Sequence, residues 1–515
     1  MTFKEFFWRF RWPLLLLLNT AICVLVVLFM PFGYAANDDT TMACIAKGCM
    51  FGAPDSHVVY IHFVLGQLLA WLYGVMGGVE WYTLFMLACQ VVAVTVVAER
   101  VIETQREGFG LWLSLIAIYL LYSTFTQNLT FTIGAGLLAT AGVLTILKQG
   151  NWWPKVGGAL LFLLAALLRF DAAMFTGVAT LLLFPFVVSG SGFDLRQFGT
   201  LAAIAIIALS LNTINGNYYL RDPKWHDYWV HNSMRAECTD SYSNFRAKTN
   251  LPEGITESDY TCLSWYFFYE TDRFTNPIME QLVATINQSA SWHGIPHVKR
   301  LKLIFVWYCI KSWLPYLAVV ALLYVAVAFN CHKRRWIWLA VALVGMVVVC
   351  NGVIMVRVLK YRALLALLLP AWFIPLSQVK IKRAIPIMVL AVALLLLQNR
   401  PVVLKKPTAI AAVSQFIGSR TPIILYGNTP DAFNIECSDE VSFGWVSRMP
   451  GANYVRNFPQ LLDPERYIFV CTDTGEEAVD QMCLSLKDHY GIEARYDYLY
   501  CDSTIAVFTL APNNE

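Results

Sequence analysis

The stretch that decides the fold is residues 13–40, which read PLLLLLNTAICVLVVLFMPFGYAANDDT. Residues 13–31 form an almost uninterrupted apolar run, close to the roughly 20 residues that a helix needs to cross a bilayer. No small-residue cleavage site follows the run, and its only charged inner flank lies before it. We therefore expect a retained membrane anchor rather than a cleaved signal peptide. An acidic pair, Asp38 and Asp39, follows a few residues later.

The composition extends this interpretation to most of the chain. Of the 515 residues, 57% are hydrophobic and only 14% are charged, whereas soluble domains carry about 25% charged residues. This excludes a soluble enzyme, a disordered chain and a fibrous repeat protein. The net charge of +3 is too small and too dispersed for a nucleic-acid-binding protein.

Apolar runs predict a mostly α-helical, polytopic membrane bundle with about eleven spans. The predicted spans are 13–31, 81–98, 110–126, 129–147, 155–168, 172–189, 198–214, 303–329, 336–355, 362–376 and 384–398. A twelfth apolar stretch, 58–77, decides the topology. If it lies as a re-entrant or interfacial outer helix, nearly every basic cluster falls on one side, as the positive-inside rule requires. If it spans, the rule fails.

We therefore expect a cytoplasmic N-terminus, with Lys4, Arg9 and Arg11, and an extracytoplasmic C-terminus in the cell membrane. A transmembrane domain would cover residues 1–399, with outer loops at 32–80 and 215–302. Residues 400–515 have a different composition, in which β-branched runs alternate with helical patterns such as 476–490. This pattern predicts a small extracytoplasmic α/β domain.

Eight cysteines fall in the three outer segments, in even numbers. They are Cys44 and Cys49; Cys238 and Cys262; and Cys437, Cys471, Cys483 and Cys501. Even counts outside the membrane are what disulfides in an oxidising compartment require, although chance parity is the alternative. A metal site is the less favoured interpretation, because no CxxC or clustered His/Cys pattern is present.

Ionisable residues at the outer ends of the spans are the candidate functional groups. Asp38 and Asp39 could form a general base or ligate a divalent cation such as Mg²⁺ or Mn²⁺, or belong to a plain polar loop. Arg169 and Asp171 lie in a tight hairpin, where an ion pair that helps the turn is the alternative. The stretch 54–82, with His57 and Glu80, could wall a groove or be a further span.

Arg357, Lys360 and Arg362 form the one outer cluster that violates the positive-inside rule. An anionic partner such as a phosphate or pyrophosphate at the membrane surface would explain it. Anchoring to lipid headgroups is the alternative.

These features, in this order, resemble the GT-C superfamily of integral-membrane glycosyltransferases, which includes protein mannosyltransferases and lipid A aminoarabinose transferases. The resemblance lies in the acidic pair after the first span, the Pro-led segment 54–60 before an apolar outer helix, the Arg-x-Asp at 169–171, and KYRALLALLLP at 360–370. It covers roughly residues 1–400. The loop 232–260 also resembles uncharacterised bacterial membrane proteins of the same layout.

The resemblance implies a polyprenyl-phosphate-linked sugar donor and an envelope glycan, lipid or protein acceptor on the outer face. Asp38 or Asp39 would act as the base toward the acceptor hydroxyl. The lipid phosphate would be held by Arg357, Lys360 and Arg362, and Arg169 and Asp171 would line the same cavity. The sequence departs from the family in having Asp-Asp where Asp-Glu or Glu-Asp is common, and in its C-terminal domain.

The chemistry of sugar transfer agrees with this assignment, because a phosphate leaving group needs positive charge and the acceptor needs a base. No Gly-rich nucleotide-binding loop is present in the sequence, which agrees with a lipid-linked donor rather than a nucleotide sugar. A single displacement would invert the anomeric carbon. Adjacent carboxylates fit a mechanism with or without a metal. Two other functions stay open: a transporter or flippase of a lipid-linked saccharide, and a non-catalytic scaffold that presents residues 400–515.

Overall fold

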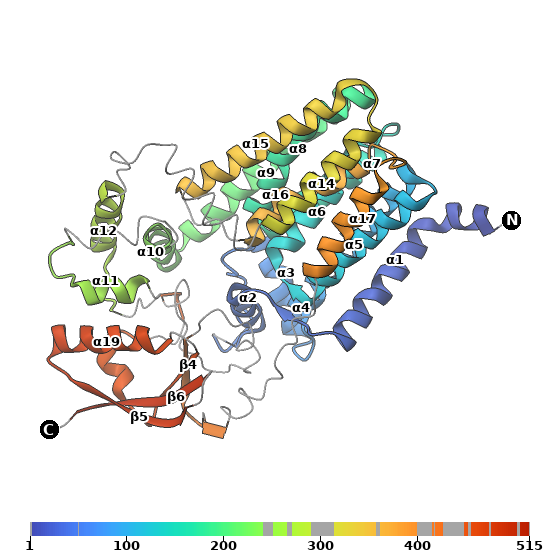
Figure 1. The fold of residues 1–515 in the computed structure, drawn as a ribbon. Coiled ribbons are helices and arrows are strands. Elements are labelled where there is room, and N and C mark those ends of the chain that lie inside the picture. Colours follow the sequence, from blue (N-terminus) through green and yellow to red (C-terminus); the bar gives the residue numbers. More distant parts are fainter. Residues whose placement is uncertain are drawn as a thin grey trace.

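The computed structural model describes residues 3–49, 51–239, 251–264, 270–289, 314–356, 361–398, 415–416, 418–425, 448–451, 455–472, 475–501 and 505–513. Within these ranges the protein is mostly helical, with a small sheet near the C-terminus. Figure 1 shows a bundle of long helices beside a smaller part that holds the C-terminal sheet and several shorter helices.

Eleven described helices correspond to the predicted spans. They are α1 (Phe3–Phe29), α4 (Trp81–Gln105), α5 (Phe109–Gln127), α6 (Phe131–Ile146), α7 (Trp153–Leu168), α8 (Phe170–Ser191), α9 (Leu195–Arg221), α14 (Leu314–Asn330), α15 (Trp336–Val356), α16 (Tyr361–Leu376) and α17 (Ile385–Gln398). Six of them, α1, α4, α5, α8, α9 and α15, are long and apolar enough to cross a membrane. The predicted class, a polytopic helix bundle with a small C-terminal α/β region, is confirmed. The start of the predicted span 303–329 lies outside the described residues.

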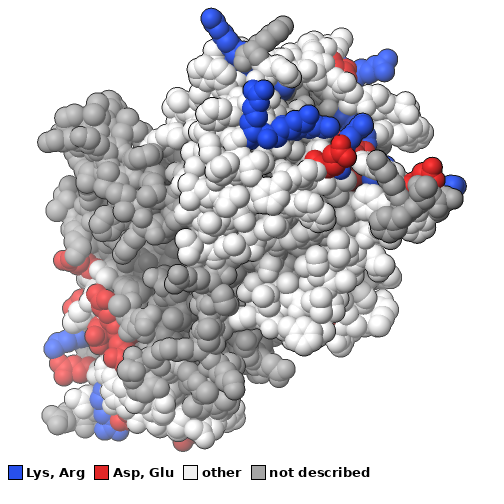
Figure 2. Space-filling model, turned by 45° about the vertical axis from the view of Figure 1, so that its right-hand side comes forward, with Lys and Arg blue, Asp and Glu red and all other residues white. Residues whose placement is uncertain are grey.

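The disputed stretch 58–77 forms a short helix, α3 (Phe63–Val75), of 13 residues. A helix of that length is about 20 Å long, whereas the hydrocarbon core of a bilayer is about 30 Å thick. α3 is therefore about 10 Å shorter than that core, but α17 with 14 residues is almost as short, so the outer, non-spanning position of α3 stays a prediction. Figure 2 shows charged side chains gathered toward two ends of the visible face, with an uncharged band between them. Which end faces the cytoplasm stays a prediction.

Small residues on α6 set how closely the central helices pack. A Cβ atom on Gly142 would lie 2.6 Å from the backbone oxygen of Gly158 in α7, and one on Gly158 would lie 2.5 Å from the oxygen of Gly142. A Cβ atom on Gly136 would lie 3.0 Å from the Cα of Ala366 in α16. Helices in a membrane gain little from apolar burial alone, so such close backbone contact is what holds them together.

The segment after α1 is tied to the junction between α5 and α6. Two short strands, β1 (Gly33–Tyr34) and β2 (Asn128–Leu129), pair in parallel, and the backbone N–H of Ala35 donates to the oxygen of Leu129 at 2.9 Å. The chain then enters α2 (Asn37–Lys47), which carries the acidic pair in its first turn. These bonds place the start of α2 directly over the start of α6.

The C-terminal part contains a four-stranded sheet in the order β3-β4-β6-β5, with β3 and β4 parallel and the other pairs antiparallel. The elements are β3 (Thr421–Leu425), β4 (Tyr467–Thr472), β5 (Ala494–Cys501), β6 (Ile505–Pro512) and the helix α19 (Gly475–Tyr490). The sequence pattern predicts β3, β4, β6 and α19. It misses β5, an edge strand that reads ARYDYLYC and is half-buried or exposed along its whole length.

The predicted outer loop 215–302 packs against this C-terminal part. Its helices are α10 (Pro223–Thr239), α11 (Glu257–Ser264) and α12 (Asn276–Ser289), and α11 lies beside α19 (Figure 1). The carboxylate of Asp259 is fully buried and accepts hydrogen bonds from Arg273 at 2.7 Å, Ser485 at 2.7 Å and His489 at 2.6 Å. A buried cluster of charges therefore fixes the loop to α19. The predicted domain boundary at residue 400 lies outside the described residues and stays a prediction.

Replacing Asp259 by alanine should weaken this docking by about 1–3 kcal/mol, because it removes the acceptor of buried Ser485 and of partly buried Arg273, which keeps its pair with Glu270. Burial raises the pKa of Asp259, but hydrogen bonds from Thr256 and Ser485 and the charges of Arg273 and His489 outweigh it, so the pKa lies below its usual value. The contribution is thus complete above about pH 4 and is lost as the pH falls through the lowered pKa. Limited proteolysis and thermal unfolding of the full-length protein measure it.

The control for this test is Glu493→Ala, which removes a surface pair with Lys487 (2.6 Å) in the same part of the protein. It should leave both measurements unchanged. Equal effects of the two substitutions would contradict the role given to Asp259.

The predicted disulfides are not supported. The eleven described cysteines are free thiols, while Cys309 and Cys437 lie outside the described residues. Cys238 is buried in the core around α10 to α12, whereas Cys262 is buried in the core of the C-terminal sheet. Cys238, Cys262 and Cys471 thus act as small apolar side chains within a core rather than as disulfide partners.

Cys44 and Cys49 are close because of how α2 ends. Gly48 adopts a positive φ of 92°, its N–H bonds the oxygen of Ile45, and the N–H of Cys49 bonds the oxygen of Cys44 at 2.9 Å. This is a Schellman motif, which brings the side chains of these two positions together.

Cys49 should therefore be the more reactive thiol on the protein surface. A hydrogen bond from Cys44 lowers its pKa to about 6, helped by Lys47 and opposed by burial. At pH 7 iodoacetamide should alkylate Cys49 faster than the exposed Cys501, as followed by mass spectrometry of each peptide. Cys44→Ala should slow the reaction at Cys49 and leave Cys501 unchanged. An unaltered rate at Cys49 would show that the hydrogen bond does not control it.

Candidate functional site

The candidate site lies at one end of the bundle. The C-terminal ends of α1, α5 and α7 and the N-terminal ends of α4, α6, α8 and α16 meet there, below α2. Helix N-termini carry partial positive charge, so this end of the bundle favours carboxylates and phosphates.

The structure brings Asp38 and Arg362 together, although 324 positions separate them. The guanidinium of Arg362, in the first turn of α16, donates to the carboxylate of Asp38 at 2.5 Å. Their side chains are 14% and 12% exposed, respectively. The pair is thus partly shielded from water, which strengthens it, yet a ligand can still reach it.

Asp39 has a different environment. It is fully buried, and its Oδ1 accepts hydrogen bonds from the hydroxyl of Tyr82 at 2.8 Å and from the N–H of Phe131 at 2.9 Å. Phe131 is the first residue of α6, and the preceding Thr130 makes no side-chain cap. Asp39 therefore caps α6 from a separate helix, which satisfies an N–H group that would otherwise be unpaired.

Burial raises the pKa of Asp39 to about 7, against the lowering effects of its hydrogen bonds and of Arg362. Asp38 is held as an ion pair, while Asp39 is partly protonated near neutral pH. The two adjacent carboxyls are thus chemically distinct.

Arg169 lies on the other side of Phe131. It joins α7 to α8, and its guanidinium lies 4.9 Å from the ring centre of Tyr60 and 5.1 Å from that of Phe131. It also pairs with Asp171 at 3.2 Å, whose side chain is 66% exposed. Phe131 therefore contacts Asp39 through its backbone and Arg169 through its ring, which places a second cation beside the acidic pair.

His57 and Glu80 make contacts elsewhere on the outer segment. The Nδ1–H of His57 donates a 2.7 Å hydrogen bond to the carboxylate of Asp55, and its ring is stacked on Trp225 (4.0 Å) and on Tyr218 (5.1 Å). Glu80 pairs with Lys47 at 2.6 Å, at the opposite end of α2 from the acidic pair. His57 thus joins the segment before α3 to α9 and α10. The roles predicted for both residues in substrate binding stay predictions.

Two of the predicted cations, Arg357 and Lys360, lie outside the described residues. Tyr82, Tyr60 and Phe131 are site residues that the sequence did not single out. An aromatic residue near the end of an apolar helix is typical of the membrane interface, so sequence gives no signal that distinguishes them.

Within the described ranges, no group of three or more His, Cys, Asp or Glu residues could hold a metal ion. Asp38 faces Arg362 and Asp39 faces Phe131 and Tyr82, so the two carboxyls are directed at different partners. The predicted Mg²⁺ or Mn²⁺ stays a prediction.

Comparisons with known proteins gave one kind of match. No family model and no curated protein sequence matches the chain. Among solved structures, it is similar to ArnT from Cupriavidus metallidurans bound to undecaprenyl phosphate (TM-score 0.39) and in the apo state (TM-score 0.41). Each match has 12% sequence identity and covers 96% of this chain and 97% of the other. The first of these proteins holds a polyprenyl phosphate, the ligand class that the sequence resemblance implies. At these TM-scores the likeness carries no argument about activity.

Asp39→Asn should remove a pH dependence from protein stability. Because the pKa of Asp39 is raised in the fold, unfolding releases its proton, and the free energy of unfolding should fall as the pH rises from about 4 to about 7. Asparagine keeps the acceptor oxygen for Phe131 and does not titrate. Thermal unfolding in detergent between pH 5 and 8 should show the variant gaining stability relative to the wild type as the pH rises.

The matched control is Asp171→Asn, at an exposed carboxyl on the same end of the bundle. Its curve should run parallel to that of the wild type. If the Asp39→Asn curve is also parallel, the raised pKa is refuted.

Proposed function

We propose that the protein is a membrane glycosyltransferase that moves a sugar from a polyprenyl-phosphate donor to an acceptor hydroxyl at the extracytoplasmic face. The observation that carries this proposal is the partly exposed ion pair between Asp38 and Arg362 at the end of an apolar helix bundle. It combines, at one point, a base for the acceptor and a cation for the leaving phosphate.

The proposed reaction begins when the donor phosphate binds Arg362 and displaces Asp38. A phosphate suits a guanidinium at least as well as a carboxylate does, because it offers several oxygens to the same planar set of donors. Asp38 is then free to accept a hydrogen bond from the acceptor hydroxyl. Binding of the donor thus prepares the base.

In the transfer step the acceptor oxygen attacks the anomeric carbon and gives its proton to Asp38. The bond between that carbon and the phosphate oxygen breaks, and the leaving phosphate takes the electron pair. Arg362 and the N-termini of the neighbouring helices stabilise the charge that develops on it. A single displacement of this kind inverts the anomeric configuration.

Asp39 supports the reaction without taking part in proton transfer. Its Oδ1 accepts hydrogen bonds from Phe131 and Tyr82, and its raised pKa reduces the negative charge next to Asp38. A second full negative charge at that position would repel the incoming phosphate. Arg169 offers a further positive charge beside Phe131. No observation among the described residues specifically favours a flippase or a scaffold.

Asp38→Asn should lower the rate of transfer by about 10²–10⁴-fold, the usual contribution of a general base. Asp39→Asn should retain most activity, because the amide oxygen still caps α6. The first measurement compares envelope glycans of cells with and without the protein, which identifies the product. Initial rates of the variants in purified form, corrected for folded protein, then give the effect. The control is Asp272→Asn, at an exposed position away from the site.

The double substitution Asp38→Arg with Arg362→Asp distinguishes catalysis from structural support. It should rebuild an ion pair and restore folded protein without restoring transfer, since the base and the phosphate ligand have changed places. Recovered transfer in the double variant would mean that the pair is only structural, and full activity of Asp38→Asn would refute the base assignment.

A further inference from the structure

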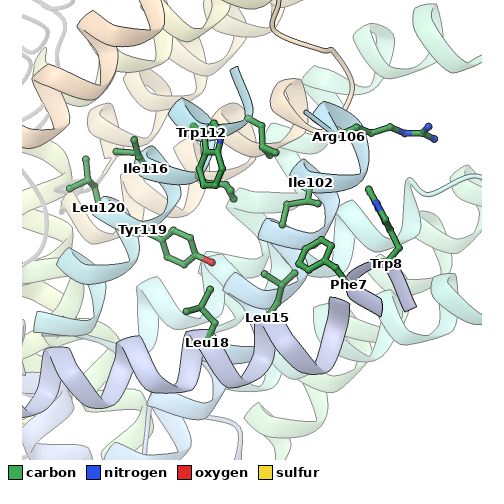
Figure 3. Close-up of a pocket in the computed structure, with 12 residues that line it drawn as sticks. Phe7, Trp8, Leu15, Leu18, Ile102, Arg106, Trp112, Ile116, Tyr119 and Leu120 are labelled. Carbon is green, nitrogen blue, oxygen red and sulfur yellow. The ribbon is translucent and has the colours of Figure 1, made fainter. Parts of the chain in front are cut away.

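A second candidate ligand site lies at the other end of α1 from the acidic pair. The N-terminal half of α1, the C-terminal end of α4 and the face of α5 enclose a groove of about 760 Å³ (Figure 3). Its lining is almost entirely apolar and includes Phe7, Leu18, Ile102, Trp112 and Tyr119. On α1 it extends from Phe7 to Leu18, which at the rise of an α-helix is about 16 Å. That is close to half of the roughly 30 Å hydrocarbon thickness, or one leaflet.

A positively charged side chain, that of Arg106, lies at the rim of this apolar groove. Arg106 directly follows α4, its side chain is exposed, and Figure 3 shows it at the same end as Trp8 and Phe7. Among the described residues Arg106 has no ion-pair partner. Arg11, by contrast, pairs with Glu99 at 3.1 Å and with Glu103. A positive charge beside an apolar groove matches a ligand with one charged group and a hydrocarbon chain.

Hydrogen bonds from Gln105 bring more positive charge to the same end. Its side chain donates to the backbone oxygens of Leu376 and Val379 and accepts from the N–H of Ile381. The segment after α16 is thereby fixed at the end of α4, and it continues into exposed Lys382 and Arg383. Figure 2 shows Lys and Arg side chains gathered at one end of the molecule.

We propose that this groove binds an anionic phospholipid, with one acyl chain between α1 and α5 and its phosphate at Arg106. A neutral lipid would place no net negative charge beside the guanidinium of Arg106. The phosphate of a polyprenyl-phosphate donor is assigned to Arg362, at the opposite end of the bundle, so the lipid proposal does not rest on the proposed activity.

Native mass spectrometry of the full-length protein in detergent tests this proposal. The probes are phosphatidylglycerol and phosphatidylcholine with identical acyl chains. Phosphatidylglycerol should bind about fivefold more tightly, the factor that corresponds to one cation near an anionic headgroup. Arg106→Gln should remove this preference. Leu115→Trp, which fills the groove, should weaken the binding of both lipids.

The matched control is Arg9→Gln, which removes an exposed cation of α1 that does not line the groove. It should keep the preference for phosphatidylglycerol. Arg106 is on the surface, so its variant should fold, and thermal unfolding checks this for every variant.

Three results would overturn the proposal. One is an equal affinity of the two lipids for the wild type, and another is an unchanged preference in Arg106→Gln. The third is displacement of phosphatidylglycerol by polyprenyl phosphate at lower concentration, which would assign the groove to the donor lipid. Loss of sugar transfer in Asp38→Asn with intact lipid binding would leave this site unaffected.

Discussion

The structure depends on the close contact that α6 makes with its neighbours. Gly142 and Gly158 leave no room for a side chain between α6 and α7, and Gly136 brings α6 almost as close to Ala366 of α16. Ala366 lies one helical turn from Arg362. The position of that arginine is therefore set by α6, and α6 is itself held at its first residue by Asp39. The acidic pair and the basic residue meet because they share this neighbour.

Two adjacent aspartates obtain opposite properties from this arrangement. Successive positions on an α-helix point about 100° apart, so Asp38 and Asp39 in the first turn of α2 cannot face the same partner. One is directed at a partly exposed guanidinium, and the other at the buried start of α6. Burial then favours the neutral form of Asp39, and the cation favours the charged form of Asp38. The chemical difference between Asp38 and Asp39 therefore follows from the different directions of their side chains.

The sequence predicts the helices, because long apolar runs have few alternative structures. It also predicts those site residues whose charge would be unfavourable at the membrane without a partner. A basic cluster that violates the positive-inside rule is unfavourable without an anionic partner, which singles out Arg362; the sequence predicts a phosphate there, and the structure pairs Arg362 with Asp38. Contacts between distant segments are not predictable in this way. The capping of α6 by Asp39 requires that α2 lie over Phe131, and the burial of Asp259 requires α19; no local pattern encodes either contact. The predicted disulfides are not supported for the same reason, because an even number of cysteines in a segment does not mean that two of them lie close together.

The outer part of the protein is joined to the site through His57. Its ring stacks on Trp225 of α10, and α10 packs on α12, which belongs to the segment that docks on the C-terminal sheet. On the other side, His57 precedes Tyr60 by three residues, and the ring of Tyr60 contacts Arg169. The short chain segment from His57 to Tyr60 thus connects α10, which packs on α12, to Arg169 of the site. An acceptor held by that domain would be positioned relative to Asp38 by stacked rings rather than by a flexible linker, which reduces the entropy lost when the hydroxyl is aligned with its base.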